Sequence, residues 1–231
     1  NEIYKKWKNE WYTIHTQIVK DVDEFGNRIK TKIIGNRKYV TALREHGNRW
    51  YEGKYKDGKQ EGKWIMWIND NKWLEWEYKD GKLEGKAAVW YENGNKIYEE
   101  EYKDGKKEGK EFGWWENGTV RYEEEYKDGK KDGKYIGWWE NGNISCEGEY
   151  KDGKREGKWI VWYDNGNKLS ETEYRDGKEE GKCIRWFKNG NKWYEGEYKD
   201  GKQEGKWIGW WENGIKWYEG EYKNGSLFLI E

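Results

Sequence analysis

The sequence contains no proline, two cysteines, two histidines and one methionine in 231 residues. It also contains no run of about 18 apolar residues, the length that a membrane-spanning helix needs. Lysine and arginine number 45 and aspartate and glutamate 46, so there is no basic excess for binding nucleic-acid phosphates. These absences argue against a helical membrane protein and a nucleic-acid-binding protein. The chain begins at Asn1 rather than methionine, which indicates a processed or trimmed segment.

Charge and aromatic content give opposite indications about folding. Charged residues make up 39% of the chain and the mean hydropathy is −1.47, values typical of disordered segments. Disordered segments are poor in aromatic residues, however, and this chain has 20 Trp, 19 Tyr and 4 Phe. Because such large rings bury much apolar area, we expect a folded chain.

One phrase recurs along most of the sequence. It opens with Tyr-Lys/Arg-Asp-Gly and has the consensus YKDGKxEGKWIxWYENGNKxYEGE. We expect a cap of degraded repeats over residues 1–54, seven repeats over 55–221, and a partial repeat with a capping strand over 222–231. The repeats open at Tyr55, Tyr78, Tyr102, Tyr126, Tyr150, Tyr174 and Tyr198.

Two turn signals divide each repeat of about 24 residues into two strands. Asn-Gly, as in Asn213-Gly214, and Asp-Gly, as in Asp152-Gly153, supply the positive φ angles of tight hairpins. The runs between them have the length of a strand. The fold class predicted is therefore all-β, an elongated antiparallel array of β-hairpins in a single-sheet, solenoid-like meander. At strand spacing, seven such repeats extend roughly 65 Å.

Residue alternation predicts which side of the sheet is buried. A three-residue hairpin loop would place Ile208, Trp210 and Tyr218 on one inner face, with the repeated glutamates such as Glu219 on the other. A two-residue loop would reverse this and place Trp210 with the glutamates. We expect the three-residue loop. Gly196, between Tyr194 and Tyr198, is expected to let a cross-strand ring lie flat on the backbone.

Few residues are available for catalysis or metal binding. His15 and His46 have no metal-ligand spacing around them. Cys146 and Cys183 occupy positions that hold tyrosine and tryptophan, respectively, in other repeats. They lie about 20 Å apart at sheet spacing, too far for a disulfide. We expect no metal site and no cofactor.

The carboxylates recur in every repeat, which is typical of architecture rather than of a single catalytic pair. Glutamates face lysines such as Lys63, Lys110, Lys158 and Lys206, and such cross-strand pairs stabilise a sheet by about 0.2–1 kcal/mol each. No phosphate-binding loop, kinase signature or nucleophile elbow is present. We predict no catalytic residues and no enzyme activity.

Aromatic residues beyond the expected inner face are the candidates for function. Two explanations remain open: both faces of the sheet are covered, by coiling or self-association, or the second face binds a protein, a glycan or a cationic ligand. The candidate partner-binding residues of this outer aromatic face are Trp64, Trp73, Tyr91, Trp115, Trp139, Trp159, Tyr163, Phe187, Trp193, Trp207, Trp211 and Trp217.

The unit GKxEGKWIxWYENGNKxYEGEYKDG resembles the bacterial variant of the MORN repeat (membrane occupation and recognition nexus), found in YwqK-type antitoxin-like proteins. The likeness runs from Tyr55 to Tyr222. It implies a non-enzymatic scaffold that binds another protein, a toxin or a surface protein such as an adhesin, with the cell envelope favoured over the cytoplasm. The tryptophan content departs from the commoner Tyr/Phe-rich units. The alternative function is binding of a carbohydrate or choline-type ligand through the aromatic ladder.

Overall fold

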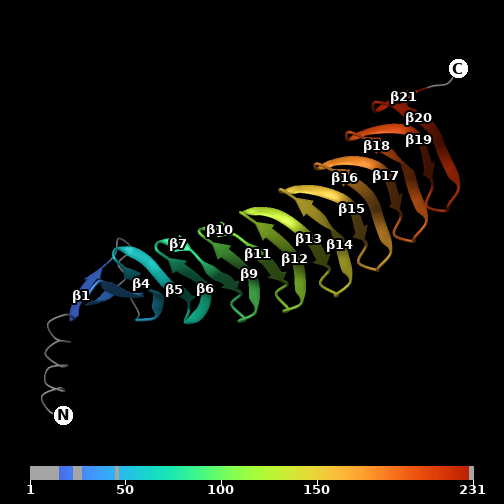
Figure 1. Cartoon of the computed structure of the whole chain (residues 1–231). Helices are drawn as coiled ribbons and strands as arrows, with labels where there is room; N and C mark the ends of the chain where they lie inside the picture. Colours follow the sequence, from blue (N-terminus) through green and yellow to red (C-terminus); the bar gives the residue numbers. More distant parts are fainter. Residues whose placement is uncertain (1–15, 23–27, 45–46, 229–231) are drawn as a thin grey trace, which may run out of the picture. The chain divides into compact units, whose positions relative to one another are not determined.

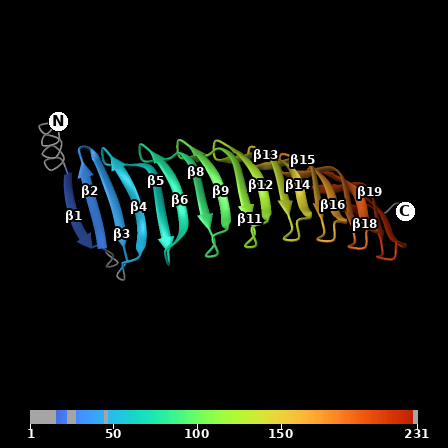
Figure 2. The ribbon, with the colours of Figure 1, turned by 90° about the horizontal axis from the view of Figure 1, so that it is seen from below.

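The structure, a computed structural model, describes residues 16–22, 28–44 and 47–228. The chain divides into two compact units, Asn1–Glu108 and Gly109–Glu231. Each unit is an antiparallel meander in which strands pair in chain order (Figures 1 and 2). The prediction of an all-β array of hairpins, two strands to a repeat, is confirmed. His15 and His46 lie outside the described residues.

The first unit begins with three paired strands that lack the repeat phrase and continues into the repeats. Strands β1 and β2 pair in antiparallel fashion, with Thr16 opposite Ile34. That these strands are a cap made of decayed repeats stays a prediction. The strands are β1 (Thr16–Val22), β2 (Arg28–Ile34), β3 (Arg37–Leu43), β4 (Arg49–Lys56), β5 (Lys59–Ile68), β6 (Asn71–Lys79), β7 (Lys82–Leu83), β8 (Gly85–Trp90), β9 (Lys96–Lys103) and β10 (Lys106–Lys107).

The second unit is the more regular one. The strands are β11 (Gly109–Trp114), β12 (Val120–Lys127), β13 (Lys130–Trp138), β14 (Ile144–Lys151), β15 (Lys154–Trp162), β16 (Lys168–Arg175), β17 (Lys178–Trp186), β18 (Lys192–Lys199), β19 (Lys202–Trp210), β20 (Lys216–Lys223) and β21 (Ser226–Phe228). The short β21 pairs with β20, as the apolar end of the sequence predicts, and Leu227 there is 48% exposed. Leu229 and Ile230 lie outside the described residues.

The two turn signals give two kinds of hairpin. At Asp200-Gly201 both residues have positive φ (52° and 78°), and Lys199 pairs directly with Lys202 across a two-residue turn. At the Asn-Gly loop, Trp211 N–H donates to the Ile215 carbonyl and Gly214 N–H donates to the Trp211 carbonyl, each at 2.8 Å. Residues 212–214 therefore form the predicted three-residue loop, with Gly214 at a φ of 83°.

The predicted face assignment is nevertheless wrong, because a β-bulge follows the loop. Trp210 pairs with Lys216, whereas Gly209 pairs with Tyr218, so Trp217 is an extra residue in β20. One extra residue reverses which side chains share a face. Ile208 thus lies opposite Glu219, and Trp207 lies opposite Gly220.

We call the side of Trp207, Tyr218 and Tyr222 the tyrosine face and the side of Ile208, Trp210 and Glu219 the glutamate face. The same bulge recurs in the other loop hairpins.

Most of the buried apolar residues lie on the tyrosine face, where tryptophans pack among tyrosines, whereas Trp67 and Ala88 are buried on the glutamate face. Trp207 is only 3% exposed, and its ring centroid lies 5.1 Å from that of Tyr198 and 6.2 Å from that of Tyr222, both edge-on. Trp159 and Trp64 pack in the same way, each between the tyrosine that opens its own repeat and the tyrosine that opens the next one. Edge-to-face packing of this kind adds about 0.5–1.5 kcal/mol per pair beyond the area buried.

Trp64, Trp159 and Trp207 each lie over a glycine of the preceding strand. A Cβ placed on Gly196 would lie 2.3 Å from the Trp207 ring, and Gly148 meets the Trp159 ring at the same distance. The expected flat packing of a ring on Gly196 is thus confirmed. Where the core residue is small the preceding residue is larger: Cys183, fully buried, contacts Thr172, with Oγ1 and Sγ 3.4 Å apart. The two positions therefore compensate in size.

Candidate functional site

The candidate functional surface lies along the Asn-Gly loops, where the residues beside the loops vary between repeats. In the second unit each three-residue loop is preceded by a large aromatic residue, and three of these side chains bond to the following repeat. In the second unit Trp115 Nε1 donates to the Trp138 carbonyl (3.2 Å), and Trp139 Nε1 donates to the Trp162 carbonyl (3.1 Å). Tyr163 makes the equivalent bond, from its hydroxyl to the Trp186 carbonyl at 3.0 Å. Each ring is thus held against the following repeat.

Asparagines add a second set of bonds between consecutive loops. Asn189 and Asn191 both donate from Nδ2 to the Glu212 carbonyl, at 3.0 and 2.9 Å. Asn165 and Asn167 do the same one repeat earlier. The last loop departs from the pattern because Ile215 takes the place of the second asparagine, and its side chain has no amide to donate.

The aromatic row becomes exposed at this last loop. Trp211 is 57% exposed, Ile215 62%, Trp217 51% and Trp193 42%. The rings of Trp211 and Trp217 lie 5.4 Å apart between centroids, and Trp193 packs at 5.6 Å against Phe187. We call the three exposed residues of this last hairpin, Trp211, Ile215 and Trp217, the exposed apolar cluster; Trp193 lies one repeat earlier. Exposed patches of this kind mark interaction sites on soluble proteins.

The structure separates the predicted site residues into two groups. Trp64, Trp159 and Trp207 are 7%, 3% and 3% exposed, so the expectation that they lie on an outer face is wrong. They belong to the core because the bulge turns them to the tyrosine face. The remaining candidates are half-buried or exposed, and a role in partner binding stays a prediction for them. They are Trp73, Tyr91, Trp115, Trp139, Tyr163, Phe187, Trp193, Trp211 and Trp217.

Sequence reasoning missed Ile215, the most exposed member of the cluster. The signal that could have found it is the change from asparagine to isoleucine in a turn position. In the other loops of this unit the position holds asparagine or, at Thr119, another polar residue.

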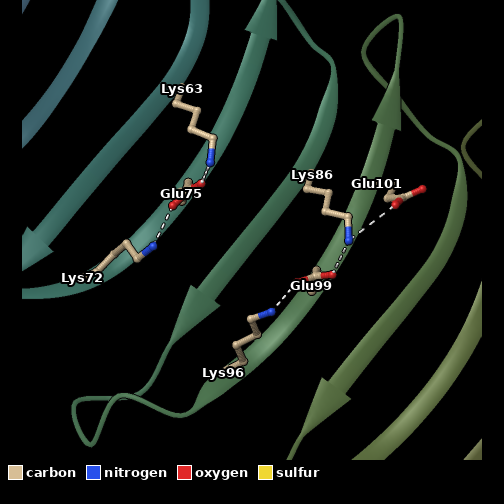
Figure 3. Close-up of polar contacts among 7 residues, drawn as sticks. All are labelled: Lys63, Lys72, Glu75, Lys86, Lys96, Glu99 and Glu101. Carbon is tan, nitrogen blue, oxygen red and sulfur yellow. Dashed lines mark hydrogen bonds and ion pairs between the residues drawn. The ribbon is translucent and has the colours of Figure 1, made fainter.

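The glutamate face consists of repeated ion pairs. Glu75 lies between Lys63 and Lys72, 2.7 Å from each Nζ, and Lys86, Glu99 and Lys96 form the equivalent group in the next repeat (Figure 3). The same arrangement in the second unit is formed by Lys206, Glu219 and Lys216. The predicted pairing of lysines with the repeated glutamates is confirmed.

These ion pairs shift the carboxyl pKa values downward. Burial alone would raise the pKa of Glu75, but hydrogen bonds from Lys63 and Lys72 outweigh burial and lower it. Hydrogen bonds from Lys206 and Lys216 lower the pKa of Glu219 to about 2. Because exposed pairs of this type stabilise by at most about 1 kcal/mol each, the glutamate face is repeated architecture with its charges satisfied internally.

No other chemistry is concentrated in the part of the chain that the structure describes. Among the residues described there is no group of three or more His, Cys, Asp or Glu side chains suited to a metal ion. Cys146 and Cys183 are both free thiols, as their separation predicts, and burial raises the pKa of each. Over the described residues, no helix has the length and apolarity needed to span a bilayer.

Comparison with known families agrees with this architecture. The sequence model described as "MORN repeat variant" matches six consecutive segments that together cover more than half of the chain. These are residues 83–104, 107–128, 131–152, 155–176, 179–200 and 203–224. The chain belongs to the MORN repeat variant family. MORN repeats are commonly protein- or membrane-binding modules and are in general not enzymes.

The matched MORN segments begin at residue 83, so the repeat that opens at Tyr55 precedes them. Each matched segment contains one Asn-Gly loop and one bulge, and it ends at the first residue of the following two-residue turn, which is aspartate in five segments and Asn224 in the last. No curated protein sequence matches the chain.

Solved structures similar to this MORN chain include two of TarM. One is an S. aureus TarM mutant in complex with fondaparinux, alpha-GlcNAc-glycerol and UDP, with 8% identity and a TM-score of 0.24. The other, titled "Crystal Structure of TarM", has 9% identity and a TM-score of 0.24. The likenesses cover 68% and 66% of this chain and 24% of each TarM chain. At this TM-score they say nothing further about the protein.

Proposed function

We propose that this MORN-repeat protein is a non-enzymatic interaction module that binds a protein partner through the exposed apolar cluster. The observation that supports the proposal most strongly is the exposure of Trp211, Ile215 and Trp217, at 51–62%. Equivalent rings such as Trp139 and Tyr163 are bonded to the following repeat. Tryptophan is enriched among the residues that dominate binding energy at protein interfaces.

The partner class that we propose is a toxin or a cell-surface protein such as an adhesin. Support comes from the resemblance to the repeats of YwqK-type antitoxin-like proteins. The charge balance of the chain supports a predominantly apolar rather than a charge-driven contact, because lysines of the glutamate face are already paired.

The proposal is tested by affinity capture from the native organism with matched variants of the full chain. We expect Trp211→Ala/Trp217→Ala to lose the captured protein, since truncating an interface tryptophan typically costs about 2 kcal/mol or more. The control is Tyr39→Ala, which removes a 37% exposed ring of the first unit that is not among the candidate partner-binding residues and should leave capture unchanged. The measurement is the recovery of each captured protein by quantitative mass spectrometry.

Undiminished capture by the double variant would contradict the proposed surface. Recovery of no protein by the wild-type chain would contradict the proposed function itself.

A further inference from the structure

A cavity of about 450 Å³ lies on the tyrosine face of the second unit, where the repeat changes its residues. Ser145 and Cys146 stand at two consecutive positions that hold Arg121–Tyr122 one repeat earlier and Trp193–Tyr194 two repeats later. Cys146 pairs directly with Gly137, so the opposite strand contributes no side chain at this point either.

Rings fill the equivalent space in the preceding hairpin and in the last hairpin of the unit. A Cβ on Gly113 would lie 2.2 Å from the Tyr122 ring, and one on Gly209 would lie 3.1 Å from the Trp217 ring. At Gly137 the closest atom is instead the hydroxyl oxygen of Ser145, at 2.8 Å. Ser145 and Cys146 place no ring over Gly137, which leaves this space open beside Ser145. The volume of the cavity lies within the range of small-molecule sites.

Aromatic rings in fixed positions form the walls of this cavity. Trp115 and Trp139 both line it, and the indole N–H of each is bonded to a backbone carbonyl of the following repeat. Tyr122 and Tyr135 complete the aromatic lining. Because these rings are held before any ligand arrives, binding would require little loss of side-chain freedom.

The polar groups of the cavity are few and converge on it. Glu124 is 4% exposed; it accepts a hydrogen bond from the Tyr126 hydroxyl (2.9 Å) and pairs with Lys131 at 2.6 Å. Burial raises the pKa of Tyr135 to about 12, so its hydroxyl remains a donor at neutral pH.

Arg121 adds an unbalanced positive charge. Its guanidinium lies 4.7 Å from the Trp115 ring, and within the described residues the structure gives it no carboxylate partner. Since Glu124 and Lys131 neutralise each other, the cavity has one positive charge available to a ligand.

We infer that this cavity binds a monosaccharide that has a carboxylate group, such as a uronic acid. Aromatic rings pack against the apolar C–H face of a sugar, while Glu124, Lys131, Tyr135 and Ser145 offer donors and acceptors to its hydroxyls. The planar guanidinium of Arg121 matches a carboxylate in a bidentate geometry. The net positive charge disfavours a choline-type cation. This site is separate from the exposed apolar cluster and does not depend on the proposed function.

The first experiment fills the cavity with residues that the repeat already uses. In calorimetric titrations with glucuronate, Ser145→Trp/Cys146→Tyr should bind at least about tenfold more weakly than the wild-type chain. The matched control is Leu169→Trp/Ser170→Tyr, which introduces the same two residues at the equivalent positions of the next repeat, neither of which lines the cavity. The control should bind as the wild type does.

The second experiment leaves the fold untouched and removes only the charge. Arg121 is exposed, so Arg121→Gln should fold normally, and we expect it to weaken glucuronate at least about tenfold. Wild-type chain should bind neutral glucose more weakly than glucuronate, and Arg121→Gln should remove that preference.

Three results would overturn the inference. They are the absence of saturable glucuronate binding to the wild-type chain at millimolar concentration, unchanged binding by the filled variant, and equal wild-type affinity for glucose and glucuronate.

Discussion

Trp207→Ala is expected to lower the free energy of unfolding of the second unit by about 3–5 kcal/mol. Trp207 is 3% exposed and packs against the rings of Tyr194, Tyr198 and Tyr222, so its removal leaves a cavity that the rigid sheet backbone cannot close. The measurement is urea denaturation of the full chain followed by circular dichroism.

The matched control removes an equally large ring from the same face. Trp217→Ala, at a position that is 51% exposed, should cost less than about 1 kcal/mol. Equal losses for the two substitutions would show that the core does not lie at Trp207.

The second large effect concerns the compensation in size between neighbouring strands. Gly196→Thr places a Cβ 2.3 Å from the Trp207 ring and is expected to cost about 3 kcal/mol by overpacking. Trp207→Cys is expected to cost about 3–5 kcal/mol by leaving a cavity. Together these two changes recreate the pair that Thr172 and Cys183 form one repeat earlier. We expect the loss of unfolding free energy in the double variant to be about 2 kcal/mol smaller than the sum of the two single losses.

A control with two positions that do not touch distinguishes compensation between residues 196 and 207 from a general tolerance of such substitutions in the repeats. Gly148→Thr combined with Trp207→Cys changes the same residue types, but Gly148 packs against Trp159 rather than Trp207. The two losses should add within about 0.5 kcal/mol. If the losses of Gly196→Thr and Trp207→Cys also add in their double variant, residues 196 and 207 do not compensate each other in size.

Much of the fold could be predicted because each repeat has strong local signals. Asn213-Gly214 and Asp200-Gly201 determine where the chain turns. The segments between such turns have the length of a strand. The separation of Cys146 and Cys183 and the pairing of Lys63 with a repeated glutamate also follow from the repeat alone. These features depend on residues close in sequence or at a fixed period.

The face of the core could not be predicted because it depends on one backbone irregularity. The loop length was predicted correctly, yet the bulge at Trp217 adds one residue to β20 and reverses the alternation beyond it. Nothing in the residue types of Lys216 and Trp217 marks a bulge. Gly196 was the better indicator of the core face. A residue at this position must lack a side chain only if a ring packs on the same face of the sheet, as the Trp207 ring does.

The functional surfaces depend on departures from the repeat rather than on the repeat. The ring at position 211 has the same residue type as those at 115 and 139, and it is more exposed than either. Ile215 in an asparagine position, and Ser145 with Cys146 in aromatic positions, are the sequence changes that accompany the exposed apolar cluster and the cavity.

The distribution of buried and exposed tryptophans is tested most directly by hydroxyl-radical footprinting with mass spectrometry of the full chain. We predict slow indole oxidation at Trp64, Trp159 and Trp207, which are 7%, 3% and 3% exposed. Oxidation should be fast at Trp193, Trp211 and Trp217, which are 42–57% exposed. Fast oxidation of Trp207, or protection of Trp211 and Trp217 in the isolated chain, would contradict both the core on the tyrosine face and the exposed apolar cluster.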